Sequence, residues 1–184
     1  YGDCISSHPI DESKLLLAYQ QSIYLLERIG SDIDIIDEFT LKYDVAGISH
    51  ANNTVISVAF CPWKPNVFVA GYENGMMCLF DTIEKREIRK LYDMKHIQKV
   101  LSVSWIKNSD GRIVFYGLFQ NGLLRFFDLE LNQHTQNYVF ETNLTNSNNV
   151  KGKMNTPCCK SLKSFIAISN IMGNHSFSMH RICC

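Results

Sequence analysis

Two segments of the sequence repeat each other, and this repeat restricts the possible folds more than any other feature. Asn74-Gly75 recurs 47 positions later as Asn121-Gly122, and Phe80-Asp81 recurs at the same spacing as Phe127-Asp128. Self-similarity at a period of about 20 to 50 residues is typical of architectures that stack copies of one small unit. The chain is therefore predicted to contain several copies of a unit that buries its apolar surface against its neighbours.

Each copy reads as three short strands separated by turn residues, with almost continuous apolar runs that predict burial on both faces of a sheet. The Asn-Gly pairs predict two-residue hairpin turns in which both residues have positive φ. The strands of the two clear copies are expected at Val55–Phe60, Val67–Gly71 and Met76–Asp81, and at Val100–Trp105, Ile113–Gly117 and Leu123–Asp128.

Weaker copies flank these two, so that the central strands of four units centre near Ala18, Ala70, Tyr116 and Ala167. The segment from Gly30 to Asn53 has enough apolar residues for one outer strand and a loop. We therefore expect repeated units over residues 1–130, an Asn-rich insertion or loop over residues 131–153, and a degenerate unit or divergent tail over residues 154–184.

Composition argues against several classes of partner. Eighteen Lys and Arg balance eighteen Asp and Glu, so a dominant attraction to nucleic acid or to an anionic membrane is not expected. No apolar run approaches the roughly 18–20 residues of a membrane-spanning helix. The seven cysteines form no C-x-x-C pair, which favours a reducing intracellular compartment, cytoplasm or nucleus. Residue 1 is Tyr, so we expect the chain to be a fragment of a longer protein.

The repeated units resemble WD repeats, the four-stranded blades of β-propellers. The resemblance implies an all-β fold: a partial WD-repeat-like β-propeller of about four blade-like units, two clear and two degenerate. A histidine ahead of the innermost strand, a serine within it, a turn dipeptide and a closing aromatic-Asp pair define the family pattern. The matching structural positions here are His50, Ser57, Asn74, Gly75, Phe80, Asp81, His96, Ser102, Asn121, Gly122, Phe127 and Asp128.

Two departures from the family pattern alter what the resemblance implies about stability. Phe80 and Phe127 replace the family's Trp and carry no N–H donor, while Asn74 and Asn121 replace its turn Asp. The family's buried hydrogen-bond network is thus incomplete, and apolar packing is expected to hold the blades. Asp81 and Asp128 are expected to close turns in different blades.

No catalytic or metal-binding motif is evident. The sequence contains no nucleotide-binding glycine loop, no H-E-x-x-H and no G-x-S-x-G. His175, His180, Cys183 and Cys184, even with Cys158 and Cys159, do not have a standard zinc spacing. The charged run from Lys85 to Lys90 is expected to form a solvated outer edge strand. We therefore expect no enzyme activity, no cofactor, no metal and no small-molecule substrate.

Three aromatic residues in turns are the candidate partner-binding residues: Trp63, Tyr72 and Phe119. For Tyr72 and Phe119 the alternative is that they fill gaps between blades. The resemblance implies a non-enzymatic scaffold or adaptor that binds other proteins on the propeller rim within a larger complex. A narrower resemblance, over Ile113 to Asp128, is to WD-repeat ubiquitin ligases of the RING type in DNA repair. It implies the alternative of a substrate-recognition propeller whose catalytic parts lie outside this chain.

Overall fold

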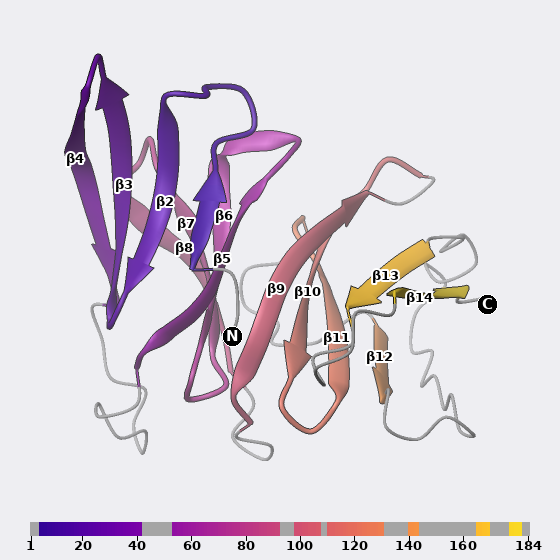
Figure 1. Cartoon of the computed structure of the whole chain (residues 1–184). Helices are drawn as coiled ribbons and strands as arrows, with labels where there is room; N and C mark the ends of the chain where they lie inside the picture. Colours follow the sequence, from indigo (N-terminus) through magenta and orange to yellow (C-terminus); the bar gives the residue numbers. More distant parts are fainter. Residues whose placement is uncertain are drawn as a thin grey trace.

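A computed structural model describes residues 4–41, 53–92, 98–107, 110–130, 140–143, 165–169 and 177–181. All regular secondary structure in these residues is β-strand, arranged in antiparallel sheets (Figure 1). The described part contains no helix suited to crossing a membrane. The all-β fold predicted from the sequence is confirmed.

Three four-stranded sheets follow one another along the chain, and we call them blades 1, 2 and 3. Within each blade the strands lie in chain order. Blade 1 consists of β1 (Ile5–Ser7), β2 (Lys14–Tyr19), β3 (Ser22–Ile29) and β4 (Asp32–Thr40). Blade 2 consists of β5 (Val55–Cys61), β6 (Lys64–Tyr72), β7 (Met77–Asp81) and β8 (Arg86–Leu91). Blade 3 consists of β9 (Val100–Lys107), β10 (Ile113–Phe119), β11 (Leu123–Asp128) and β12 (Phe140–Asn143).

The remaining strands, β13 (Phe165–Ser169) and β14 (Phe177–Arg181), form a two-stranded sheet. They fall in residues 154–184, where the sequence predicts a degenerate unit or a tail. β12 falls in residues 131–153 and pairs with β11 as the outer strand of blade 3. The proposed boundaries of these two segments stay predictions.

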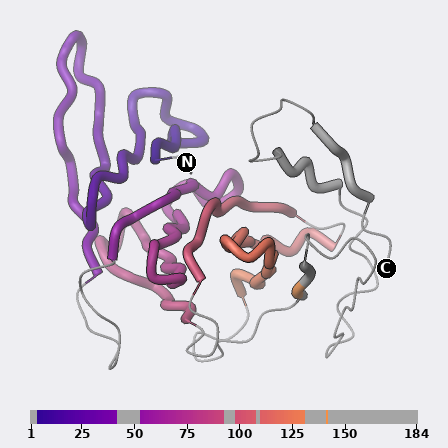
Figure 2. The backbone as a smooth tube through the Cα atoms, turned by 60° about the horizontal axis from the view of Figure 1, so that its bottom comes forward, coloured from indigo at the N-terminus to yellow at the C-terminus, as the bar shows by residue number. Residues whose placement is uncertain are grey.

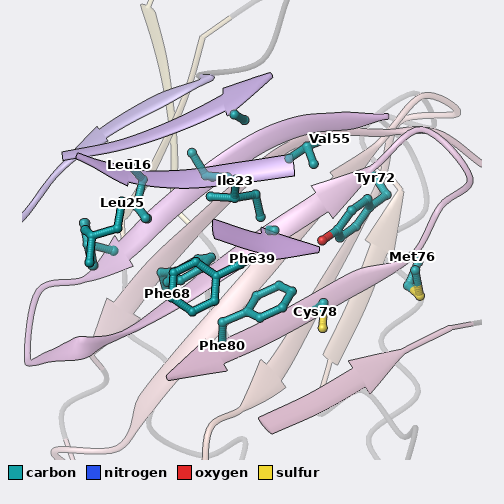
Figure 3. Packing of buried hydrophobic residues seen from close by; sticks show 14 of the residues in the cluster. Leu16, Ile23, Leu25, Phe39, Val55, Phe68, Tyr72, Met76, Cys78 and Phe80 are labelled. Carbon is teal, nitrogen blue, oxygen red and sulfur yellow. The ribbon is translucent and has the colours of Figure 1, made fainter. Parts of the chain in front are cut away.

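The blades lie face to face along the stack (Figure 2). Two layers of buried apolar side chains fill the space between them. On β6, Phe68, Ala70 and Tyr72 belong to the layer shared with blade 1, and Val67 and Val69 belong to the layer shared with blade 3. Alternate residues of a strand point to opposite faces, so blade 2 is apolar on both sides. Figure 3 shows the first layer, in which Phe39 of blade 1 lies against Phe68 and Phe80.

The position of blade 1 in the repeat differs by one residue from the sequence alignment. A bulge interrupts the pairing of the two outer strands after Leu25 in blade 1 and after Leu79 in blade 2, which makes these residues equivalent. On this register Leu17, and not Ala18, corresponds to Ala70. In blade 3 the buried layers give the register. Phe115 and Phe119 face blade 2 as Phe68 and Tyr72 face blade 1, so Gly117 rather than Tyr116 corresponds to Ala70. A shift of one residue exchanges the two faces of a strand, and only packing distinguishes the two alignments.

The Asn-Gly turns differ from the predicted two-residue form. Gly75 and Gly122 have positive φ, 83° and 77°, whereas Asn74 and Asn121 do not. The Gly75 N–H donates to the Tyr72 carbonyl at 3.1 Å, which closes a three-residue loop with a glycine in the left-handed region. The Asn74 side-chain oxygen accepts from Met76 N at 3.1 Å, and Asn121 accepts from Leu123 N at the same distance. Asparagine serves here as a side-chain acceptor, not as a residue with positive φ.

Hydrogen bonds join the first strands of neighbouring blades. The buried Ser57 hydroxyl accepts from the Val103 N–H at 3.2 Å, and Trp105 Nε1 donates to the Ala59 carbonyl at 2.9 Å. Between blades 1 and 2, the Ser6 hydroxyl accepts from Phe60 N at 3.0 Å. Each bond crosses an interface that is otherwise apolar, and therefore helps to set the register between blades.

Charged groups on or beside the outer strands of blades 1 and 2 also contact the neighbouring blade. Lys85 Nζ of blade 2 lies 3.0 Å from Asp37 Oδ2 of blade 1, and Arg89 Nη1 donates to the Asp128 carbonyl of blade 3 at 3.1 Å. Arg89 is only 4% exposed, so the expectation of a fully solvated edge strand is wrong at this position. Burial lowers the pKa of Arg89, while the nearby Asp128 acts in the opposite direction. Arg89 is buried because its side chain points toward blade 3, where it donates to a backbone carbonyl, and not toward solvent.

Two glycines allow close contact between blades 2 and 3 and give a matched stability test. A Cβ at Gly71 would lie 2.9 Å from Val103 Cγ1 and closer still to Val100 Cγ1. A Cβ at Gly117 would overlap only the Met77 side chain. Since β-branched valines are stiff and methionine is flexible, we expect Gly71→Ala to lower the free energy of unfolding by about 1–3 kcal/mol, and Gly117→Ala by less. Urea denaturation of the full chain would measure both; equal losses would contradict this view of the interface.

Candidate protein-binding surface at one end of the blades

The turns of the blades gather at two ends. Because consecutive strands are antiparallel, the first and third turns of a blade lie at one end and the second turn lies at the other (Figure 1). We call these the double-turn end, at the top of Figure 1, and the single-turn end. The β1–β2, β3–β4, β5–β6 and β7–β8 turns lie at the double-turn end. Tyr72 and Phe119 lie beside the single-turn end, and Trp63 lies at the double-turn end.

The structure corrects the interpretation of Tyr72 and Phe119 as partner-binding residues. Tyr72 is 0% exposed and Phe119 is 3% exposed. Both residues end the second strand of their blade and point into the layer shared with the preceding blade. The Arg125 guanidinium lies 5.4 Å from the centre of the Phe119 ring, which adds a cation–π contact to the burial. These aromatics fill the space between blades, which is the alternative that the sequence left open.

Trp63 is on the opposite end and is 42% exposed, in the turn between β5 and β6. Ile83, in the turn between β7 and β8, is 77% exposed. Ile10 and Ile29, in or beside the two corresponding turns of blade 1, are also exposed. Four turns from two blades thus present a large apolar side chain each at the double-turn end. Exposed aromatic and aliphatic residues gathered on one face are typical of protein-binding surfaces.

His8 sets the shape of the β1–β2 turn beside Trp63. Its Nδ1 atom accepts from the Asp11 N–H at 2.8 Å, and its ring lies 5.0 Å from that of Phe60 in an edge-on arrangement. The blade 1 turn is thereby held against the blade 2 strand that leads to Trp63. Lys64, next to Trp63, lies 3.6 Å from the Glu130 carboxylate and connects this turn to blade 3.

The repeated aspartates hold turns at this same end. Asp81 Oδ1 accepts from the N–H groups of Ile83 and Glu84 at 2.8 and 2.9 Å, and its Oδ2 accepts from Asn66 Nδ2 at 2.7 Å. Asp128 Oδ1 accepts from Glu130 N at 2.8 Å in the equivalent place. The two carboxylates lie in different blades, and each accepts hydrogen bonds from the backbone of the turn that follows it. Asp81 also fixes the loop that presents Ile83.

Of the three cysteines in the described residues, Cys4 is exposed, and Cys61 and Cys78 are buried. Burial raises the pKa of the Cys61 and Cys78 thiols, which disfavours the nucleophilic thiolate. Within the described ranges, no three His, Cys, Asp or Glu side chains come together as metal ligands. Several histidines and cysteines singled out from the sequence lie outside the described residues: His50, His96, Cys158, Cys159, His175, Cys183 and Cys184. His180 lies on β14, where only the strand is described.

The remaining repeat positions occupy matching places in blades 2 and 3. Phe68 and Phe80 stack at 5.0 Å, and Phe115 and Phe127 stack at 5.4 Å. Ser102 is the equivalent of Ser57, but it is half-buried on the face of blade 3 that points away from blade 2. The sequence analysis missed Ile83, His8 and Arg89. A large apolar residue in the polar turn Asp81-Thr-Ile-Glu-Lys85 was the available signal for Ile83.

Four-stranded antiparallel sheets that pack face to face, with their first strands close together, are the arrangement of β-propeller blades. The described part of the chain folds as a partial propeller. No family model and no curated protein matches the sequence.

Solved structures identify the type of propeller. The chain is similar to the C-terminal WD40 domain of Sif2, with a TM-score of 0.58 and 20% identity over 78% of this chain and 37% of that chain. It is also similar to a chain of the mitotic checkpoint complex, with a TM-score of 0.57 and 14% identity over 77% of this chain and 38% of that chain. The fold is therefore that of WD-repeat blades, and the chain spans less than two-fifths of either similar chain.

Loss of the Asp81 carboxylate tests its place in this surface. Asp81→Ala removes three hydrogen bonds from a part-buried turn and should lower the free energy of unfolding by about 1–3 kcal/mol. Asp34→Ala, at an exposed position on β4, is the matched control and should leave stability nearly unchanged. Chemical denaturation of the full chain measures both, and similar values for the two variants would contradict the assigned role.

His8 gives the surface a dependence on pH. Burial lowers the pKa of His8 from 6.5, while Asp11 raises it and Lys14 lowers it. Below about pH 6.5 the unfolded chain therefore binds a proton more readily than the folded chain, and acidification destabilises the fold. His8→Asn keeps a side-chain acceptor for the turn but does not titrate. Between about pH 7 and 5.5 the original chain should lose more unfolding free energy than this variant; parallel pH profiles would contradict the assignment.

Proposed function

We propose that this chain is a non-enzymatic protein-interaction scaffold that binds partner proteins through the double-turn end of its blades. The observation that carries the proposal is the contrast between the two ends. Large apolar residues in turns are exposed at the double-turn end, as with Trp63 and Ile83. Beside the single-turn end, Tyr72 of blade 2 and Phe119 of blade 3 are buried, and the equivalent Tyr19 is exposed in blade 1, whose outer face no described blade covers. Rigid sheets hold these turns in fixed positions, so several weak contacts can add up to specific binding.

We further propose that the chain acts within a larger assembly. Tyr19 of blade 1 occupies the position of Tyr72 in blade 2, yet Tyr19 is 62% exposed where Tyr72 is 0% exposed. Ile5 is likewise exposed, although its equivalent Val58 is buried. Blade 1 thus presents, on its outer side, the type of face by which blades 2 and 3 pack on their predecessors. A partner or further blade that covers this face would complete the stack.

Protein partners fit this surface better than other ligands do. The balanced charge of the chain favours neither nucleic acid nor an anionic membrane, and we propose an intracellular scaffold, cytoplasmic or nuclear, without cofactor or metal. No feature of the described residues is particular to a ubiquitin ligase, and that alternative stays a prediction from the sequence.

Affinity capture with a paired variant tests the scaffold role. The full chain, a Trp63→Ala/Ile83→Ser variant and a Gln21→Ala/Gln120→Ala control would be expressed in cells of the source organism, cross-linked and analysed by quantitative mass spectrometry after nuclease treatment. The control changes exposed residues at the single-turn end. Truncating two exposed anchors should lower recovery of specific partners by at least about fivefold, because such residues carry much of the binding energy.

The control should recover the same partners as the original chain, and far-ultraviolet circular dichroism should show that all three proteins are folded. Equal recovery with the Trp63/Ile83 variant, or loss of all partners on nuclease treatment, would overturn the proposal.

A further inference from the structure

The outer strand of blade 1 is an exposed sheet edge that carries apolar side chains. β4 is the last strand of its sheet, and along the edge from Asp32 to Ile36 the described residues show no further pairing strand. Ile33 and Ile35 on this strand are 61% and 64% exposed. Proteins commonly protect such edges with lysine, proline or a covering segment, because unpaired N–H and C=O groups bind other strands.

β8 is the counterpart of β4 in blade 2, and the comparison shows what is particular to β4. The shared bulge aligns Asp34 with Arg86 and Ile35 with Glu87. On β8, Arg86 is paired with Glu84, and Lys90 lies 3.1 Å from Glu87. β8 is therefore a charged edge whose charges are already compensated.

The carboxylates near the start of β4 lack such compensation. Asp32 and Asp34 make no ion pair with any described residue, and Asp32 is only near the Ser31 hydroxyl, at 3.4 Å. The pairing register places Asp32 opposite Ile29 and Asp34 opposite Glu27, on one face of the sheet. Ile33 and Ile35 lie on the other face. From Asp32 to Ile35 the free edge thus alternates acidic groups on one face with apolar groups on the other, up to the bulge at Ile36.

We propose that β4 binds an extended segment of a partner protein by strand addition, and that this segment alternates Lys or Arg with apolar residues. Backbone groups of the segment would pair with the free edge, and residues directly opposite each other would share a face. Basic side chains would then lie beside Asp32 and Asp34, and apolar side chains beside Ile33 and Ile35. Pairing of β4 with β4 of a second copy is disfavoured, because like charges would lie opposite one another.

This inference rests on the proposed scaffold role but concerns a different surface. Trp63 and Ile83 are on blade 2 turns, whereas the strand-addition site is the edge of blade 1. Failure of the capture experiment with Trp63 and Ile83 would therefore leave peptide binding at β4 to be judged separately, and failure of peptide binding would leave the double-turn surface intact.

Fluorescence anisotropy of the full chain with a labelled peptide of alternating Lys and Val tests the proposal. Two further peptides carry N-methyl groups on alternate residues, one on the Lys set and one on the Val set. N-methylation removes the hydrogen bonds of one edge of a strand only. Strand addition therefore predicts that one methylated peptide loses binding and the other retains it, and that a scrambled peptide of the same composition binds more weakly.

Protein variants locate the site. Asp32→Asn/Asp34→Asn should weaken binding of the alternating peptide by about three- to tenfold, as expected for two exposed charge pairs. Ile33→Ser/Ile35→Ser should also weaken it. Glu12→Gln/Glu84→Gln removes two exposed carboxylates elsewhere and should leave the affinity unchanged. Equal binding of both methylated peptides, or equal effects of the Asp32/Asp34 and Glu12/Glu84 variants, would overturn the proposal in favour of unspecific charge attraction.

Discussion

Apolar packing between sheet faces is the interaction on which the rest of this structure depends. A single four-stranded sheet with two apolar faces is not stable in water, but stacking buries both faces of blade 2. The same phenylalanine pair stacks in blades 2 and 3, so the interface repeats with the sequence. Phe80 and Phe127 end these pairs where WD repeats typically carry tryptophan, and the interfaces have aromatic packing without the hydrogen bond that a tryptophan N–H could donate.

Polar groups then select one arrangement of the stacked sheets. Apolar faces alone would tolerate sliding, whereas Ser57, Trp105 and Arg89 each require a particular partner in the next blade. Leaving such a buried group without its partner would cost about 1–3 kcal/mol, which is enough to favour a single register. The close approach at Gly71 adds a steric condition to the same interface.

The surfaces proposed for binding follow from where this packing ends. Within the described residues, the outer face of blade 1 exposes Tyr19 and Ile5, whose equivalents in blade 2 are buried, while the double-turn end and the edge of β4 expose large apolar side chains that no described segment covers. Such differences between blades would give a scaffold distinct binding sites, which identical blades could not offer. Under the function proposed above, the same packing that stabilises the blades also leaves these surfaces uncovered for partners.

The sequence alone determined the repeated unit, the all-β fold and the order of strands in each blade, because alternation of apolar residues and turn chemistry are local signals. It also placed Trp63 in a turn between strands and predicted that Asp81 and Asp128 close turns in different blades. Tertiary structure decided which face of each strand is inside. The apolar pattern of β2 allows either Leu17 or Ala18 to match Ala70, but a shift of one residue exchanges the buried and exposed faces. It decided as well that Tyr72 and Phe119 are buried, that Arg89 is an interior residue, and that Ile83 and β4 are exposed. Burial depends on what the next blade covers, and the residues of one segment do not specify their distant neighbours.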